Sequence, residues 1–299
     1  IVFGREVFSI HGRPVYSDFP QSNFFVWSSH GRYYDVNKGY WKWQRPNLFG
    51  TTEDLYTQTI VIPYLLPMLE NAGAVVISPR ERDWQKQEVI VDNDNPKITG
   101  IISYSEVNNK KKWETIEGSG FAYHQGTYAD GENPFIAGSA RKIKSRKRNS
   151  KLSYVAYQPN IPEDGDYAVY VSYKTIKKSV DDAEYIVFHK GQETHFRVNQ
   201  QMGGGTWVYL GTFAFDKGCN IFNRVILTNH SKHRGVVTAD AVRFGGGMGN
   251  IARGGQISGL PRALEGARYY TQWAGAPRDV VSKSNGTNDY NDDREYMDG

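Results

Sequence analysis

The pattern of apolar and polar positions changes character along the chain. Residues 24–79 begin with a segment at 24–29 whose first four residues are apolar, and continue through a polar and aromatic stretch at 31–50 into a helical pattern. A second apolar run follows at 74–78. This pattern predicts strand, loop, helix and strand. A strand, helix and strand in succession usually form a right-handed parallel crossover.

The predicted helix carries its own start and stop signals. Thr51 or Thr52 is expected to cap its first turn, because a side-chain hydroxyl can accept a bond from a free backbone N–H group there. Pro63 and Pro67 are expected to kink or divide the helix, and Gly73 to end it. The side expected to be buried carries Leu55, Ile62, Leu65, Leu66 and Leu69.

Residues 88–248 show short alternating runs separated by turn residues, which is typical of an antiparallel sandwich or jelly roll. The runs are 88–92, 100–105, 151–158, 166–174, 183–190, 193–200, 206–215, 223–230 and 236–244.

Helical spacing returns in residues 249–299, where Ser258 is expected to cap a segment that contains Leu260 and Leu264. The predicted fold class is α/β plus all-β. A partial parallel α/β domain at 1–87 would continue at 249–299 and remain incomplete at Gly299, with an antiparallel β-sandwich inserted at 88–248.

Composition and charge narrow the function classes. Mean hydropathy is −0.60, and no apolar run approaches the roughly 18 residues of a membrane span. The net charge is +4, but residues 140–151 contain seven positive side chains, so the rest of the chain is slightly negative. This is a local basic patch rather than the overall charge of a nucleic-acid-binding protein. The patch is interpreted either as a solvated hairpin or edge strand or as a contact for an anionic polymer.

Cys219 is the single cysteine, which excludes a disulfide framework within the chain and a thiolate metal site. The 20 Tyr, 14 Phe and 7 Trp residues suit sugar stacking, but they suit a β-sandwich core equally well.

His30 ends the first predicted strand and Glu53 lies in the first turn of the following helix. A parallel crossover would bring both to the same rim of the sheet, where ligands gather. Histidine and glutamate are both ligands of Zn²⁺, and catalytic zinc needs three protein ligands. The alternative is a structural histidine and an ordinary acidic residue at a helix start. Gly31 would let the backbone turn sharply beside the site.

One segment of the chain is similar to zinc-dependent N-acetylmuramoyl-L-alanine amidases. It runs from Ser28-Ser29-His30-Gly31 through Glu53 to Arg80 and Asp83. The resemblance implies that His30 and Glu53 are the first two zinc ligands. The family's third ligand is a later histidine, and a glutamate acts as its general base; both are expected beyond Gly299.

A longer resemblance covers HFRVNQQMGGGTWVYLGTFAFDKG (195–218) and GVVTADAVRFGGG (235–247). These segments look like the carbohydrate-binding-like domain of golvesin and of bacterial xanthan lyases. Such a domain implies a glycan ligand. The side chains expected to contact glycan are the aromatic rings of Tyr33, Tyr34, Tyr40, Trp41, Trp43 and Trp207.

The leading hypothesis is an exported bacterial zinc hydrolase of the amidase type that acts on peptidoglycan or a related glycan and carries a carbohydrate-binding sandwich. The first alternative is a non-catalytic glycan-binding or surface-assembly protein. The second is a xanthan-type polysaccharide lyase, in which the basic tract would neutralise a uronic acid. Nucleic acid is not an expected partner.

Overall fold

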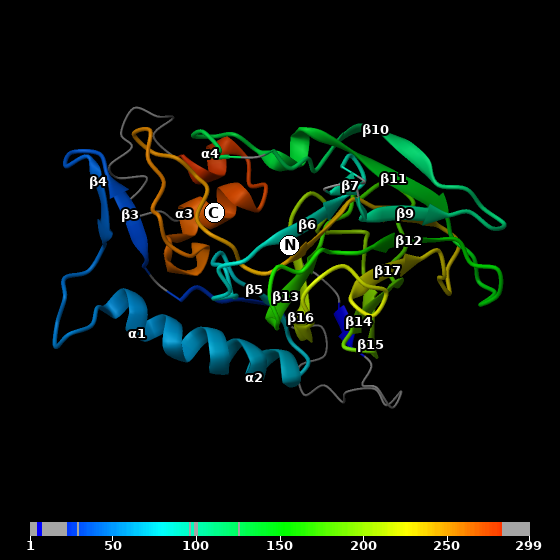
Figure 1. The fold of residues 1–299 in the computed structure, drawn as a ribbon, viewed down its shortest axis with the longest axis horizontal. Helices are drawn as coiled ribbons and strands as arrows, with labels where there is room; N and C mark the ends of the chain where they lie inside the picture. The colour runs from blue at the N-terminus through cyan, green and yellow to red at the C-terminus, as the bar shows by residue number, and fades with distance from the viewer. Residues whose placement is uncertain are drawn as a thin grey trace. The chain divides into compact units, whose positions relative to one another are not determined.

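A computed structural model describes residues 5–7, 23–28, 30–95, 97–98, 101–124 and 126–282. These residues form two compact units, shown with their elements in Figure 1. The first unit contains the described parts of 1–16, 88–123 and 134–245. The second contains the described parts of 17–87, 124–133 and 246–299.

The first unit is built from antiparallel sheets, which confirms the predicted β-sandwich. One sheet has, in order, β1 (Arg5–Val7), β15 (Gln192–Val198), β14 (Ala183–His189), β17 (Arg224–Thr228), β12 (Tyr154–Tyr157) and β9 (Tyr104–Val107). A second has β16 (Val208–Phe215), β13 (Gly165–Val171), β19 (Ala241–Phe244) and β6 (Val89–Asp92). A third has β10 (Glu114–Gly120), β11 (Gly138–Lys144) and β18 (Val236–Ala239). A short hairpin, β7 (Lys97–Ile98) and β8 (Ile101–Ile102), and the 3₁₀ turn η2 (Pro134–Ile136) complete the described elements.

The core of this unit follows from the alternation in its strands. Val187 of β14 lies opposite Val225 of β17, and Leu227 lies opposite Val155 of β12; all four are fully buried. Because successive side chains on a strand point to opposite faces, this register places one apolar row on the inner face of the sheet. The inner rows of the other strands complete one continuous hydrophobic cluster.

The second unit contains the predicted crossover in reduced form. Strand β2 (Asn23–Phe25) pairs in parallel with β5 (Val75–Ile77), and the helical segments α1 (Glu53–Ile60), η1 (Val61–Leu65) and α2 (Leu66–Asn71) lie between them in sequence. Within the residues that the structure describes, this ladder has two strands. It therefore gives no evidence for a parallel α/β amidase domain. No helix in the described part of the chain is long and apolar enough to cross a bilayer.

The predicted helix signals are largely confirmed. The Thr52 hydroxyl accepts the Leu55 N–H at 3.4 Å, so Thr52 is the cap. Pro63 lies inside η1, a π-helical turn, and Gly73 has a φ of 88°, the left-handed conformation that ends helices. The buried side was only partly predicted: Ile62 and Leu66 are buried, whereas Leu65 is exposed. A π turn holds an extra residue, which rotates the helix faces that follow it.

Two further predictions are wrong in detail. The stretch at 31–50, expected to be a loop, contains the hairpin β3 (Arg32–Asp35) and β4 (Tyr40–Trp43). Gly39, with a φ of 72°, supplies the turn that this hairpin needs.

The helix expected from Ser258 starts later, with η3 (Arg262–Leu264), α3 (Ala267–Trp273) and α4 (Arg278–Val281). The Ser258 hydroxyl accepts the Leu260 N–H at 3.2 Å and contacts the Glu265 carboxylate instead.

Candidate functional site

The His30 and Glu53 side chains lie close together in the second unit. His30 Nδ1 is 3.9 Å from Glu53 Oε1. His30 follows β2, and Glu53 is the first residue of α1, so the crossover brings a strand end and a helix start to the same place. The distance agrees with the expected proximity of the two side chains.

The Arg45 guanidinium shares this site. Its Nε lies 3.3 Å from His30 Nδ1 and 3.7 Å from Glu53 Oε2. The Arg45 backbone N–H donates to the buried Asp54 carboxylate at 2.9 Å. Burial lowers the pKa of His30, and the positive charge of Arg45 lowers it further. Both effects favour the neutral form of the imidazole.

These residues do not complete a zinc centre. A catalytic zinc ion needs three protein ligands, and the described part of the chain places no third His, Cys, Asp or Glu ligand atom within 4.8 Å of this pair. The Arg45 guanidinium also disfavours a second cation at the same point. We therefore assign no reaction step to His30 and Glu53, whose role as metal ligands stays a prediction.

Gly31 has a packing role rather than the expected turn. A Cβ at this position would lie 2.7 Å from both the Glu265 backbone and the Arg80 guanidinium. Arg80 is buried and donates to the His30 carbonyl at 2.6 Å and to the Ala263 carbonyl at 3.1 Å. The glycine therefore allows the segment after β2 to pack directly on the C-terminal part of the unit.

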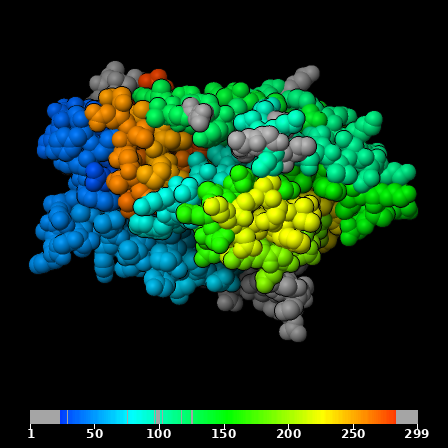
Figure 2. Space-filling view, in the orientation of Figure 1, coloured from blue at the N-terminus to red at the C-terminus, as the bar shows by residue number. Residues whose placement is uncertain are grey.

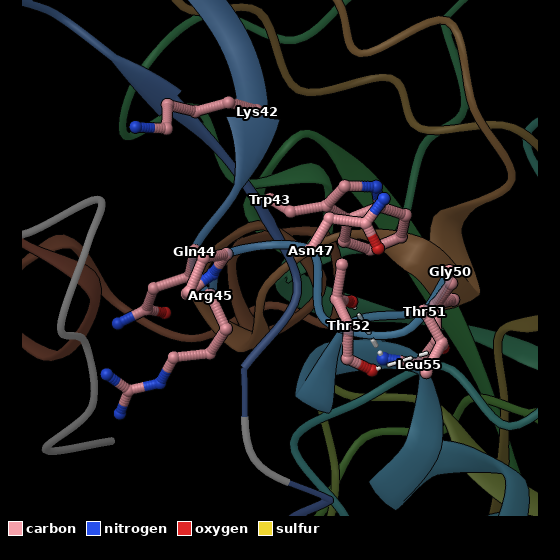
Figure 3. A pocket seen from close by; sticks show the side chains of 10 residues that line it. Lys42, Trp43, Gln44, Arg45, Asn47, Gly50, Thr51, Thr52 and Leu55 are labelled. Carbon is pink, nitrogen blue, oxygen red and sulfur yellow. Dashed lines mark hydrogen bonds between the residues drawn. The ribbon is translucent and has the colours of Figure 1, made fainter.

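An open pocket of about 480 Å³ adjoins Arg45. Its walls are the end of β4 and the loop that leads into α1, including Trp43, Asn47 and Thr51. In Figure 3 the Lys42 and Arg45 side chains extend away from Trp43, whereas Thr51, Thr52 and Leu55 form the opposite side. The pocket presents the Trp43 ring beside polar groups and the apolar side chains of Pro46 and Leu55.

The six rings expected to contact glycan fall into two classes. Four of them are at most 7% exposed: Tyr33, Tyr34, Trp41 and Trp207. These four rings have no exposed face on which a sugar could stack, so their burial does not agree with the predicted glycan contact. Tyr40 is exposed and Trp43 is half-buried; these two keep the predicted role.

The buried rings are structural. Within the second unit Trp41 packs on Tyr269 with ring centres 4.6 Å apart. Within the first unit Trp207 packs on Phe121 at 4.8 Å and on Phe135 at 5.2 Å, and the Arg243 guanidinium lies over its ring. The hydrophobic area of these rings stabilises the two cores.

A group of exposed basic side chains lies on loops of the β-sandwich. Asn109 N–H donates to the Ser153 hydroxyl at 2.9 Å, and that hydroxyl donates to the Lys111 carbonyl at 2.6 Å, which joins loop 108–112 to loop 144–153. Ser145 donates to the His233 carbonyl at 2.9 Å, which adds loop 230–235. Figure 2 shows the turquoise and green segments of this region at the right-hand edge.

These three loops carry nine exposed cations, which we call the basic loop cluster: Lys110, Lys111, Lys112, Lys144, Lys147, Arg148, Lys151, Lys232 and Arg234. Among the described residues, none of the nine has an ion-pair partner. An uncompensated group of like charges attracts polyanions.

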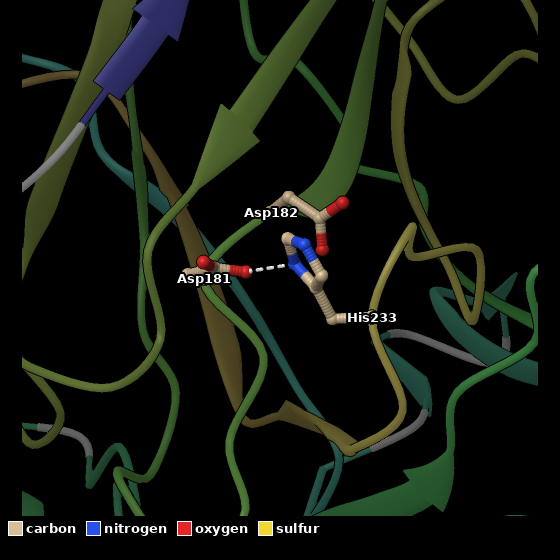
Figure 4. Close-up of side chains that lie close together, drawn as sticks. All are labelled: Asp181, Asp182 and His233. Carbon is tan, nitrogen blue, oxygen red and sulfur yellow. Dashed lines mark hydrogen bonds and ion pairs between the residues drawn. The ribbon is translucent and has the colours of Figure 1, made fainter.

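The side chains of Asp181, Asp182 and His233, at loop 230–235, lie close enough together to share a metal ion (Figure 4). The Asp182 carboxylate is already used by the loop, since it accepts the Ser231 hydroxyl and the Lys232 N–H. His233 Nδ1 lies 2.7 Å from Asp181 Oδ1. The group therefore anchors the loop that carries Lys232 and Arg234.

The first unit has recognisable relatives. Residues 119–246 match the family described as the Golvesin C-terminal domain. The chain is also 34% identical over 92 residues to the xanthan lyase of Bacillus sp. (strain GL1). Together the two matches support a carbohydrate-binding-like domain. They give no support to the amidase resemblance.

This chain spans only a small part of each xanthan lyase, and its sequence identity to the solved structures is low. The aligned part is 30% of the chain and 10% of the Bacillus lyase. The structure of Paenibacillus xanthan lyase has a TM-score of 0.39 at 24% identity, over 54% of this chain and 13% of that one. The C-terminal CBM6 of LamC from Zobellia galactanivorans has a TM-score of 0.30 at 14% identity, over 53% and 99%. Structural similarity at this level does not support an inference about function.

Sequence reasoning found one of the three loops of the basic loop cluster, the tract at 140–151. The other two are short basic runs in the sequence, 110–112 and 232–234, which lie outside the predicted strands. The order of the segments along the chain does not predict that these loops meet, because their contact depends on which strands are neighbours in the sheets.

Proposed function

We propose that the β-sandwich unit binds an acidic polysaccharide through the basic loop cluster. The observation that carries the proposal is the convergence of nine unpaired, exposed cations from three loops that hydrogen-bond to one another. The match to the Golvesin C-terminal domain and the similarity to a xanthan lyase support a polysaccharide as the polyanion.

The geometry favours a polymer over a small anion. All nine cations are exposed lysines and arginines on long, flexible stems. Such a surface recognises charge spacing along a chain more than the shape of one sugar. Uronic acids and other carboxylate-bearing sugars supply that spacing. Peptidoglycan also carries carboxylates, and it stays within the proposed ligand class.

A binding role needs no catalytic centre, so it agrees with the incomplete zinc site. It corresponds to the non-catalytic glycan-binding or surface-assembly alternative. Such a protein would act where polysaccharide lies, so we propose that it is exported.

The proposal is tested by isothermal titration calorimetry of the full chain with three polymers of matched length. These are a uronate-bearing polysaccharide, the same polysaccharide with its carboxyl groups reduced to alcohols, and duplex DNA. Binding to the acidic polysaccharide that is lost on carboxyl reduction supports the proposal. Equal binding to both polysaccharides contradicts it, and tighter binding to DNA would replace it with a nucleic-acid role.

A second candidate is the zinc amidase, favoured by the 3.9 Å approach of His30 and Glu53. It predicts zinc in the purified protein and loss of that zinc in His30→Ala, measured by atomic absorption. Absence of zinc from protein purified without chelators would remove this candidate. The lyase alternative predicts ultraviolet-absorbing products from a uronate polymer. If no such products form, this alternative is refuted.

A further inference from the structure

The Trp43 ring at the end of β4 is held in place by the neighbouring strand. Trp43 lies opposite Arg32 in the β3–β4 hairpin, and the Arg32 guanidinium lies over the ring, 5.2 Å from its centroid. The same guanidinium donates to the Trp41 carbonyl at 3.0 Å, which fixes it over the ring. Trp43 is half-buried and lines the open pocket of about 480 Å³. Arg32 therefore supports the ring, and the exposed part of the ring adjoins the pocket.

The pocket also offers polar groups that the fold does not use. Gln44 and Asn47 line it, and within the described part of the chain neither side-chain amide has a hydrogen-bond partner. The Thr51 hydroxyl makes only a long contact of 3.5 Å with the Thr52 carbonyl. Amides and hydroxyls both donate and accept hydrogen bonds. The pocket therefore combines an aromatic ring with groups that suit the hydroxyls of a sugar.

The two cations of the pocket wall are paired with acids. Lys42 Nζ lies 3.7 Å from the carboxylate of the buried Asp35, and Arg45 Nε lies 3.7 Å from the Glu53 carboxylate. Their charged ends extend away from Trp43 in Figure 3. The pocket thus differs from the basic loop cluster, whose cations have no such partners in the described structure, and it favours an uncharged ligand.

A tight turn borders the pocket. Leu48 and Thr51 exchange two backbone hydrogen bonds, of 2.7 and 3.0 Å. The two residues between them, Phe49 and Gly50, have φ angles of 52° and 80°, as in a type I′ turn. Asn47 and Gly50 both line the pocket, so Phe49 lies at its rim.

Phe49 is an unusual residue at this point of the turn. The left-handed conformation is disfavoured for a residue with a Cβ, and type I′ turns usually place Asn, Asp or Gly here. Burial does not offset this cost, because Phe49 is 105% exposed. Strained residues are found preferentially where a protein holds a ligand. The Phe49 ring is thus free to contact a ligand beside the pocket.

We propose that this pocket is a second saccharide site, which takes a neutral oligosaccharide of β-linked pyranoses. One sugar ring stacks on Trp43 and hydrogen-bonds to the amides of Gln44 and Asn47, and the oligosaccharide continues over Phe49. A pyranose with equatorial hydroxyls presents apolar C–H faces, which pack on aromatic rings, and a rim of hydroxyls, which pairs with amides. The volume of about 480 Å³ lies in the usual range for small-molecule sites. The site belongs to the second unit and does not rest on the basic loop cluster.

The test uses the full chain labelled with nitrogen-15 and cellohexaose, an uncharged oligomer of β-linked glucose. Cellohexaose is expected to shift the NMR signals of the Trp43 indole N–H and of the Gln44 and Asn47 side-chain amides until they saturate. Sodium chloride at about 0.5 M should leave the affinity unchanged, because no ion pair is involved. Shifts that salt abolishes would assign the oligosaccharide to a charged surface and overturn the proposal.

Two variants and a control locate the site. Trp43→Ala should weaken cellohexaose binding at least about fivefold, because the stacked ring is lost. Phe49→Asn should weaken binding about two- to tenfold and raise the thermal midpoint by about 1–3 °C, because Asn tolerates the left-handed conformation and no packed ring is removed. Tyr64→Ala removes another exposed ring of the second unit outside the pocket and should leave the affinity unchanged.

The wild-type titration decides the proposal even if Trp43→Ala does not fold. No saturable shift of the three pocket signals would overturn it, as would unchanged affinity in Phe49→Asn together with a lower thermal midpoint, since the ring would then serve only the fold. Cellohexaose carries no carboxylate, so its failure to bind leaves the acidic-polysaccharide proposal standing. Failure of the acidic polysaccharide to bind likewise leaves the cellohexaose result intact.

Discussion

Reversing three charges of the basic loop cluster should weaken polysaccharide binding by one to two orders of magnitude or more. We choose Lys147→Glu, Arg148→Glu and Lys151→Glu in combination, because all three are exposed and none has an ion-pair partner in the described structure. Loss of a packed contact is therefore not expected to unfold the protein. The change alters only the electrostatic attraction for a polyanion.

The magnitude follows from Coulomb's law. Two unit charges 4 Å apart in water attract by about 1 kcal/mol. A Debye length of about 8 Å at physiological salt reduces this to about 0.6 kcal/mol. Reversal replaces attraction by repulsion, which changes each contact by about 1.2 kcal/mol. The expected loss of affinity therefore lies between roughly 8-fold, if one of the three meets a polymer charge, and roughly 400-fold, if all three do.

The assay is calorimetric titration with a uronate-bearing polysaccharide at two salt concentrations. The matched control is Lys97→Glu, Lys177→Glu and Lys217→Glu, which changes the net charge equally at exposed positions of the same unit that lie outside the three loops and have no ion-pair partner among the described residues. The difference between the two variants should shrink as salt rises. Equal weakening by both variants would show that net charge, and not this cluster, governs binding, and the reasoning would fail.

Three further predictions concern stability and protonation. Trp207→Ala should lower the free energy of unfolding by about 3–5 kcal/mol in urea titrations, because it empties a core site; weakened polysaccharide binding with unchanged stability would instead restore the sugar-contact prediction. Gly138→Ala should lower stability by roughly 1–3 kcal/mol, because its Cβ would collide with the Phe121 carbonyl, and an unchanged urea midpoint would contradict the packing described. His30 should titrate below its ordinary pKa of 6.5 by NMR and move upward in Arg45→Ala. As the pH falls below about 6.5, the unfolded chain protonates at His30 before the folded chain does, so His30 should lower the free energy of unfolding. An NMR titration midpoint of His30 above 6.5 would refute the burial argument.

Much of the architecture could be predicted because it depends on local patterns. Alternating runs predicted most of the sandwich strands, since a period of two is sufficient to define a buried face, but β10 and β11 were not among them. Thr52 and Gly73 marked the helix ends through chemistry that acts within one turn. The hairpin at β3 and β4 was missed because its aromatic run was interpreted as a binding loop, although Tyr34 and Trp41 alternate into the core.

The sequence by itself determined the sandwich, the strand–helix–strand order and the closeness of His30 to Glu53, because each follows from short-range periodicity and a general rule of chain crossover. Tertiary structure alone decided what these features can do. It placed Arg45 between the histidine and the glutamate, buried four of the six candidate rings, and joined three separate cationic loops into one surface. The physical reason is that charge balance and exposure depend on neighbours that are distant in sequence. Asp92 and Ala241, 149 positions apart, lie opposite each other only because β6 and β19 pair in one sheet.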